Sequence, residues 1–221
     1  LGVIYYYGLS VDKNIDKAVQ YLTLSANQNH SEAQYLLGVI YYYGLSVDKN
    51  IDKAVQYLTL SANQNHSEAQ YLLGVIYYYG LSVDKNIDKA IQYLTLSANQ
   101  NNSKSQSILG IIFYEGQSIP QDINKAINYL TISASQNNSE AQFLLGIIYY
   151  EGKYIAQNNE KAINYFTLSA NQNHSGSQYY LGRFYYNGEF VKKSINKAIV
   201  LLESSAKQGN PDGLFYYGFL F

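Results

Sequence analysis

The sequence predicts an all-α fold, a solenoid built from stacked pairs of helices. A unit of 36 residues recurs six times along the 221 residues, which is typical of a repeat architecture. Each unit holds two segments with apolar residues at helical spacing, and no segment with strand-like alternation separates them. A single pair of helices has too little apolar surface to fold alone, so neighbouring units must stack.

The units can be read directly from the sequence. Residues 1–36 and 37–72 are identical, and the third copy first differs at Ile91, which replaces Val55. The unit boundaries fall at 1–36, 37–72, 73–108, 109–144, 145–180 and 181–216, with a partial unit at 217–221. We therefore expect one continuous array, itself a fragment of a longer array.

The first helix of each unit, helix A, is predicted over residues such as 67–79. Ala69, Leu72, Leu73 and Ile76 recur at three-residue and four-residue spacing, and Gly80 follows as a stop signal. In the last unit Pro211 stands where other units have serine. Because proline suits the first helical position, the cap is predicted one residue earlier. These cap positions are His30, its equivalents, and Asn210.

The second helix, helix B, is predicted to begin after a polar cap and to end before a left-handed turn. The predicted N-caps are Asn14, Asn50, Asn86, Asp122, Asn158 and Ser194. The predicted left-handed residues are Asn29, Asn65, Asn101, Asn137, Asn173 and Gly209. Between them, Ile51, Ala54, Leu58 and Ala62 form an apolar stripe.

The conserved spacing within the unit resembles the Sel-one-like repeat (SLR), a relative of the tetratricopeptide repeat. The residues that carry the resemblance are Ala33, Leu37, Gly38, Tyr41 and Gly44, then Lys53, Ala54, Tyr57 and the run 61–65. Gly38 and Ala54 leave space where helices cross closely. The resemblance implies a right-handed α-solenoid of stacked antiparallel helix pairs, and a non-enzymatic scaffold or adaptor that acts by contact.

Composition excludes several classes of function. The 15 basic and 16 acidic residues give a net charge of −1, which argues against a nucleic-acid partner. The longest apolar run, residues 35–45, is too short for membrane insertion. Cysteine is absent, so no thiol nucleophile or Cys-based zinc site exists, and no cofactor is expected.

The cellular compartment is open. Absent cysteine favours the cytoplasm, whereas five Asn-x-Ser turns keep a secretory route possible. Their asparagines, Asn29, Asn65, Asn101, Asn137 and Asn173, already have a structural explanation as turn residues.

Motifs that suggest chemistry have simpler explanations. Ser-x-x-Lys matches begin at Ser10, Ser46, Ser82 and Ser194, but no Ser-Asp-Asn or Lys-Thr-Gly element accompanies them. The three histidines, His30, His66 and His174, occupy one turn in different units, too far apart to share a metal. The lysine at position 17 recurs in each unit, and in four units it follows an acidic residue, so we expect a solvated or ion-paired face. These acidic residues are Asp16, Asp52, Asp88 and Glu160.

Helix A is predicted to carry the binding surface. Glu32, Tyr35, Val39 and Tyr42 share a face by their spacing, and the resemblance places that face on the concave side. An extended or Pro-rich peptide, or a protein, is the expected partner, since rigid tyrosine rings offer contact area at low entropic cost. The candidate binding residues are Tyr35, Tyr42, Tyr71, Tyr78, Tyr114, Phe143, Tyr150, Tyr179, Arg183 and Tyr186.

Two alternatives stay open. The rings could instead pack between adjacent A helices, as apolar stripes usually do. The near-identical units could also stack end to end into filaments, which would make the chain a self-associating structural protein.

Overall fold

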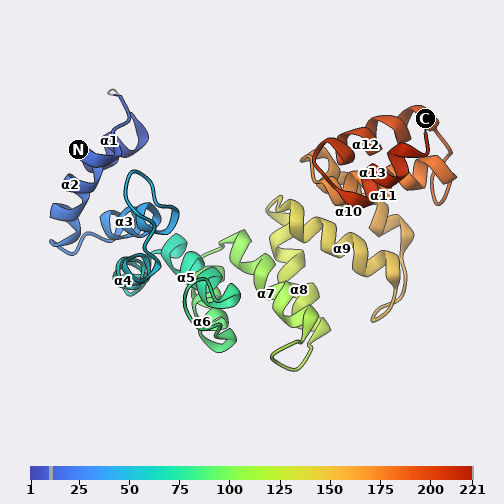
Figure 1. The fold of residues 1–221 in the computed structure, drawn as a ribbon. Helices are drawn as coiled ribbons and strands as arrows, with labels where there is room; N and C mark the ends of the chain where they lie inside the picture. The colour runs from blue at the N-terminus through green and yellow to red at the C-terminus, as the bar shows by residue number, and fades with distance from the viewer. Residues whose placement is uncertain (10–11, 221) are drawn as a thin grey trace. The chain divides into compact units, whose positions relative to one another are not determined.

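The computed structural model describes residues 1–9 and 12–220, and every regular element in these ranges is an α-helix (Figure 1). The helices are α1 (Gly2–Tyr7), α2 (Ile15–Ala26), α3 (Ser31–Tyr43), α4 (Ile51–Ala62), α5 (Ser67–Tyr79), α6 (Ile87–Ala98), α7 (Ser103–Glu115), α8 (Ile123–Ser135), α9 (Ser139–Glu151), α10 (Asn159–Asn171), α11 (Ser175–Asn187), α12 (Ile195–Lys207) and α13 (Pro211–Gly218). Ser10, which begins one Ser-x-x-Lys match, and Phe221, which ends the partial unit, lie outside the described residues.

The chain forms two compact blocks, Leu1–Leu109 and Gly110–Phe221. In the N-terminal block, α3 packs along α4 and α5 along α6, while α4 also contacts α5. In the C-terminal block, α9 packs along α10 and α11 along α12, and α10 contacts α11. Odd-numbered helices are the predicted A helices and even-numbered helices the B helices. The predicted all-α solenoid of stacked helix pairs is thereby confirmed.

The helix boundaries follow from single residues. The Lys53 amide donates to Asn50 Oδ1 at 2.9 Å, which caps α4 as predicted. The equivalent polar caps recur at α2, α6, α8, α10 and α12. Asn65 has φ 63° and its equivalents also have positive φ, so the left-handed turns are confirmed. Helix A ends at a left-handed glycine such as Gly80, with φ 67°.

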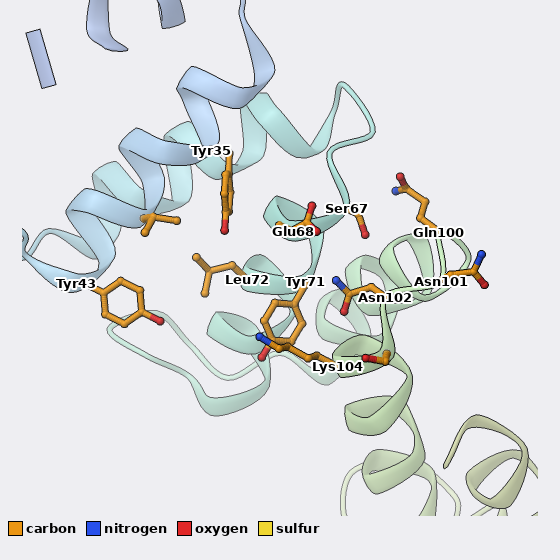
Figure 2. Close-up of a pocket in the computed structure, with 12 residues that line it drawn as sticks. Tyr35, Tyr43, Ser67, Glu68, Tyr71, Leu72, Gln100, Asn101, Asn102 and Lys104 are labelled. Atoms are coloured by element: carbon orange, nitrogen blue, oxygen red, sulfur yellow. The ribbon is translucent and has the colours of Figure 1, made fainter. Parts of the chain in front are cut away.

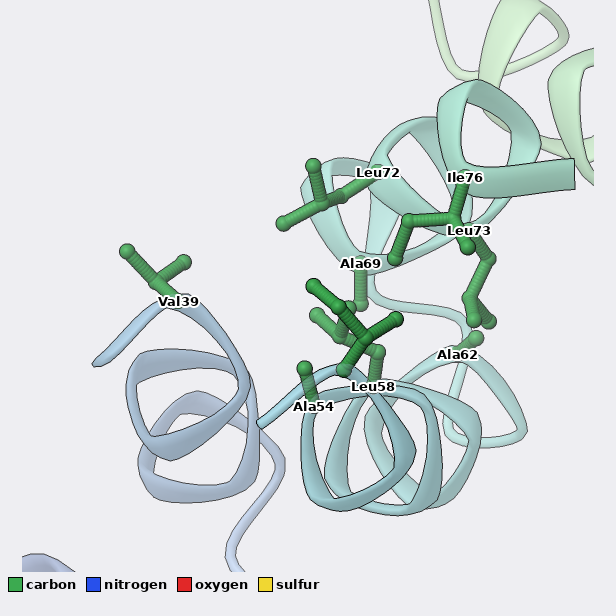
Figure 3. Packing of buried hydrophobic residues seen from close by; sticks show 9 residues of the cluster. Val39, Ala54, Leu58, Ala62, Ala69, Leu72, Leu73 and Ile76 are labelled. Carbon is green, nitrogen blue, oxygen red and sulfur yellow. The ribbon is translucent and has the colours of Figure 1, made fainter. Parts of the chain in front are cut away.

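An apolar core lies between neighbouring helices of each block. Ala54 and Leu58 of α4 are fully buried, beside Val39 of α3 and Leu73 of α5 (Figure 3). A Cβ atom added at Gly38 would lie 2.6 Å from Leu58 Cγ. The predicted close crossing at this glycine is confirmed, because no side chain fits there without displacing the leucine.

A repeated polar ladder accompanies the core, and the sequence analysis did not find it. The buried Gln70 donates through Nε2 to the carbonyl oxygen of Ala62 at 3.2 Å, while its Oε1 accepts from Gln100 Nε2 at 2.7 Å. The same glutamine bond joins residue 64 to 34, 172 to 142, and 208 to 178. Beside it, Ser61 Oγ donates to the Ser31 carbonyl at 2.8 Å. Within each block, neighbouring repeats are thus hydrogen-bonded to one another through buried amides and hydroxyls.

The lysines at position 17 of each unit are all exposed, as expected for a solvated face, and they also contact aromatic rings. The Lys53 ammonium lies 5.1 Å from the centre of the Tyr41 ring, which in turn stacks on Tyr57 at 5.8 Å. The same cation–π contact occurs at Lys17, Lys89, Lys125, Lys161 and Lys197. Within the described ranges, Lys125 alone of these six also pairs with a carboxylate, that of Asp122 at 3.2 Å.

Candidate functional site

A groove of about 500 Å³ opens on the A helices of the N-terminal block (Figure 2). Its walls come from α3, from α5, and from the turn that leads into α7. The lining residues are Tyr35, Val39, Tyr43, Ser67, Glu68, Tyr71, Leu72, Gln100, Asn101, Asn102, Ser103 and Lys104. The volume is that of an ordinary ligand or peptide-binding cleft.

The groove combines an aromatic wall with a polar rim. Tyr35, Val39 and Tyr43 are four residues apart along α3 and therefore share a face. Opposite them, the Lys104 ammonium lies 5.9 Å from the centre of the Tyr71 ring. Of the carboxamides in the α6–α7 turn, that of Asn102 lies beside this ring (Figure 2). Such a surface offers apolar contact together with hydrogen-bond donors and acceptors.

The phenol of Tyr35 stays neutral in this setting. Burial, with the nearby carboxylates of Glu68 and Glu32 adding a smaller effect, raises the pKa of Tyr35 to about 12. Burial likewise raises the pKa of Tyr71. Both hydroxyls therefore serve as hydrogen-bonding groups and not as bases at neutral pH.

His66 organises the back of the groove. Its Nδ1 accepts the Ala69 amide at 3.3 Å, so the ring caps α5 as the sequence predicts. Because Nδ1 is an acceptor, Nε2 carries the proton and donates to Glu32 Oε2 at 2.9 Å. The Tyr35 ring stacks on the imidazole at 4.6 Å between ring centres. His66 therefore links two A helices and fixes the orientation of Tyr35.

The same arrangement recurs at His174, which caps α11 and bonds to Glu140 at 3.1 Å. Over the described ranges, no three His, Cys, Asp or Glu side chains gather in a way that could hold a metal ion. His66 and His174 therefore have a structural role as caps and inter-repeat links, whereas His30 stands at the N-cap of α3 without a side-chain cap bond.

The predicted binding residues of the N-terminal block divide into two groups. Tyr35 and Tyr71 line the groove. Tyr42 does not line it; its ring lies under the Lys49 ammonium at 5.7 Å and meets Tyr43 edge-on at 4.8 Å. Tyr78 makes the equivalent contacts with Lys85 and Tyr79. The sequence analysis missed the most exposed ring of the wall, Tyr43, which is 62% exposed.

In the C-terminal block, aromatic residues cover the predicted rings. Tyr114 meets Tyr154 at 5.9 Å, and Tyr150 meets Phe190 at 6.2 Å. Tyr154 and Phe190 stand where the early repeats have serine, so the sequence carried this signal. The other predicted rings also have partners: Phe143 stacks on His174, Tyr179 contacts Tyr216, and Tyr186 lies under Lys193.

Arg183 is enclosed by aromatic rings rather than presented to solvent. Its side chain is 16% exposed, and its NH2 group donates to the Tyr150 hydroxyl at 2.6 Å. The guanidinium centre lies 5.2 to 5.9 Å from the rings of Tyr150, Tyr179, Tyr180 and Phe184. This arginine therefore joins α9 to α11, and little of its charge is available to a partner.

The chain resembles known proteins in sequence and in fold. The sequence matches the Sel1 repeat at residues 1–30, 31–66, 67–102, 103–138, 139–174 and 175–210. Five of these matches begin at the first residue of an A helix. A comparison with functionally curated proteins finds no match. No described helix is both long enough and apolar enough to span a bilayer.

Solved structures share the fold over most of the chain. A protective antigen of uropathogenic Escherichia coli with an SLR fold is 31% identical over 100% of this chain, with a TM-score of 0.84. This chain spans about half of that antigen, 47% of its length. A Sel1 repeat protein of Oxalobacter formigenes is 27% identical, with a TM-score of 0.87, and the match covers 94% of this chain and 85% of that one. With a Sel1 match in each of six repeats and these structural relatives, the chain belongs to the Sel1 repeat family.

Proposed function

We propose that this protein is a non-enzymatic adaptor that holds an extended segment of a partner protein in the groove on α3 and α5. Sel1 repeat proteins are in general protein-interaction scaffolds and are typically non-catalytic. The observation that carries the proposal is the groove itself, in which tyrosine rings from two successive A helices face the carboxamides of the following turn.

The chemistry of the groove suits an extended peptide. Tyr35, Tyr43 and Tyr71 provide flat apolar contacts for proline or aliphatic side chains. The amides of Asn101 and Asn102 can pair with backbone groups, which an extended chain exposes along its whole length. The other candidate rings on the A helices, Tyr42, Tyr78, Tyr114, Phe143, Tyr150, Tyr179 and Tyr186, would extend the surface only where a partner displaces their present contacts.

A matched pair of variants tests this proposal. Tyr43 and Tyr79 are each 62% exposed and stand at the same place in adjacent A helices, but only Tyr43 lines the groove. Peptides are selected from a phage-displayed random library on the immobilised full chain, and their affinities are measured by fluorescence polarisation. We expect Tyr43→Ala to weaken binding about tenfold, as for an aromatic interface residue, and Tyr79→Ala to leave it unchanged.

Equal affinity of the wild type and Tyr43→Ala would reject the groove as the binding site. Equal losses in both variants would mean that the peptide contacts exposed tyrosines without using the groove. Far-ultraviolet circular dichroism confirms that both variants keep the helix content of the wild type.

End-to-end self-association is a second candidate, favoured by the apolar surface of α13. Leu214 and Phe215 are 53% and 63% exposed on this helix. Large apolar side chains exposed side by side are typical of an interface with another molecule. Light scattering over a range of concentrations tests the idea. Assembly predicts a mass that rises with concentration and falls in Leu214→Ser/Phe215→Ser, whereas a constant monomer mass contradicts it.

A further inference from the structure

The loop that joins α11 to α12 differs in charge from its counterparts in the early repeats. Residues 44–53 contain two lysines and two aspartates, which give a formal charge of zero. At the corresponding positions 188–197, Lys192 and Asn196 replace the two aspartates. Three lysines and one glutamate then give a charge of +2. This loop is a local basic patch in a chain that is otherwise nearly neutral.

The three lysines surround one depression on the surface. It has a volume of about 480 Å³ and is lined by Tyr185, Val191, Lys192, Lys193, Ser194 and Lys197. Val191 and the Tyr185 ring supply the apolar part of the lining, and Ser194 adds a hydroxyl group. All three lysines therefore line one depression that a side chain of another molecule can enter.

Nothing in the described part of the chain neutralises these three lysines. The ammonium groups of Lys193 and Lys197 lie 5.7 and 5.0 Å from the rings of Tyr186 and Tyr185, which carry no net charge. The loop carboxylate, Glu189, is engaged elsewhere: it accepts from Asn187 at 2.9 Å and lies 3.9 Å from Arg183. The equivalent lysine of α8, by contrast, pairs with Asp122. The positive charge of the α11–α12 loop is thus available to a partner.

We propose that this basic patch, defined as Lys192, Lys193 and Lys197, binds an acidic segment of a partner protein, a run of Asp and Glu residues. Lysine acts as a compact point charge that needs no fixed geometry, which suits carboxylates on a flexible chain. Clustered charges of one sign also speed the encounter with an oppositely charged partner. The patch is separate from the groove of the N-terminal block, so the proposal stands independently of the peptide-binding function.

The early repeats provide a variant that should fold. Lys192→Asp/Asn196→Asp restores the two aspartates found in residues 44–53, a loop that the N-terminal block already accommodates. Because Glu189 remains, the formal charge of residues 188–197 falls from +2 to −1. Binding of a fluorescein-labelled peptide of alternating Glu and Asp to the full chain is followed by fluorescence polarisation. We expect the double variant to bind about tenfold more weakly, since each exposed charge contact contributes a factor of about five at most. Raising NaCl from about 0.1 M to about 1 M should abolish wild-type binding.

The reciprocal change supplies a gain-of-binding control. Asp48→Lys/Asp52→Asn gives the loop between α3 and α4 the same charge as the basic patch, and we expect it to add a second site for the acidic peptide. Unchanged affinity in Lys192→Asp/Asn196→Asp, with helix content retained by circular dichroism, would overturn the assignment. So would tighter binding of a single-stranded oligonucleotide of equal charge, because the patch would then select phosphates over carboxylates.

Discussion

Replacing Gln70 with Glu tests whether the polar ladder holds adjacent repeats together. In the wild type, the Gln70 amide donates to the Ala62 carbonyl at 3.2 Å and to Asn65 Oδ1 at 3.3 Å, and its oxygen accepts from Gln100. A carboxylate keeps the acceptor role but cannot donate. It would therefore place a negative charge beside two oxygen atoms in a position that is 2% exposed.

The expected cost is large for an isosteric change. Two lost hydrogen bonds account for about 2 kcal/mol, and the uncompensated buried charge raises the total to about 3–5 kcal/mol at neutral pH. The neighbouring groups cannot rearrange to donate hydrogen bonds to the new carboxylate. The Ala62 carbonyl is fixed by the helix, and Asn65 cannot rotate its amide to donate without losing its bond from Gln100 at 3.1 Å.

The free energy of unfolding is measured by urea denaturation with circular dichroism, across a range of pH. Burial raises the folded-state pKa of the new carboxyl above its unfolded value of about 4.3. When the pKa of a carboxyl group is raised in the folded state, the free energy of unfolding falls as the pH rises from the unfolded-state pKa through the folded-state pKa. The deficit of Gln70→Glu is therefore smallest below pH of about 4.3, where the protonated acid can still donate one hydrogen bond.

Gln56→Glu is the matched control, because Gln56 is exposed on α4 and the charge change is the same. We expect it to change stability by about 0.5 kcal/mol at most. A loss below about 1 kcal/mol for Gln70→Glu at neutral pH, or a deficit that does not depend on pH, would refute the reasoning that the ladder amides are energetically significant.

Three further outcomes are expected. Gly74→Ala should lower the urea midpoint, because the added Cβ atom would lie 2.5 Å from Leu94 Cγ. The resulting overpacking of about 1–3 kcal/mol outweighs the gain of about 1 kcal/mol in helix propensity. A higher midpoint would contradict the close crossing. The ultraviolet difference titration between the wild type and Tyr35→Phe should show ionisation of Tyr35 at a pKa of about 12. The contribution of this raised pKa to the free energy of unfolding is lost as the pH rises through that value. A transition near 10 would contradict the burial of the phenol. His66→Ala should cost about 1–2 kcal/mol through loss of the cap, and His66→Asn should lose less, since Asn138 caps α9 in the same way. Equal losses in the two variants would contradict the capping role.

The helix boundaries could be predicted from sequence because each depends on one residue and its local backbone. Asn50 caps α4 through an amide three residues away, and Asn65 takes the left-handed conformation that asparagine tolerates. Gly38 was predictable for a similar reason, since a missing side chain in an apolar stripe indicates close packing. None of these inferences requires knowledge of which distant residue lies opposite.

The contacts between helices could not be predicted in the same way. The Lys53 contact with the Tyr41 ring depends on how α4 lies along α3, and spacing within one helix contains no information on that placement. The same limit applies to the groove. Tyr42 and Tyr43 are both compatible with a face that includes Tyr35, and only the position of the neighbouring helices decides that Tyr43 lines it.

The polar ladder also determines how the protein would respond to mechanical force. Each glutamine–glutamine bond and each serine bond joins residues 30 apart in sequence, so every such bond connects only adjacent repeats. A repeat that is pulled away breaks its own bonds and leaves the bonds farther along the ladder intact. Detachment of one 36-residue repeat would release about 120 Å of extended chain. Stretching would therefore proceed in small, separate steps, and each step would lengthen the protein by one detached repeat.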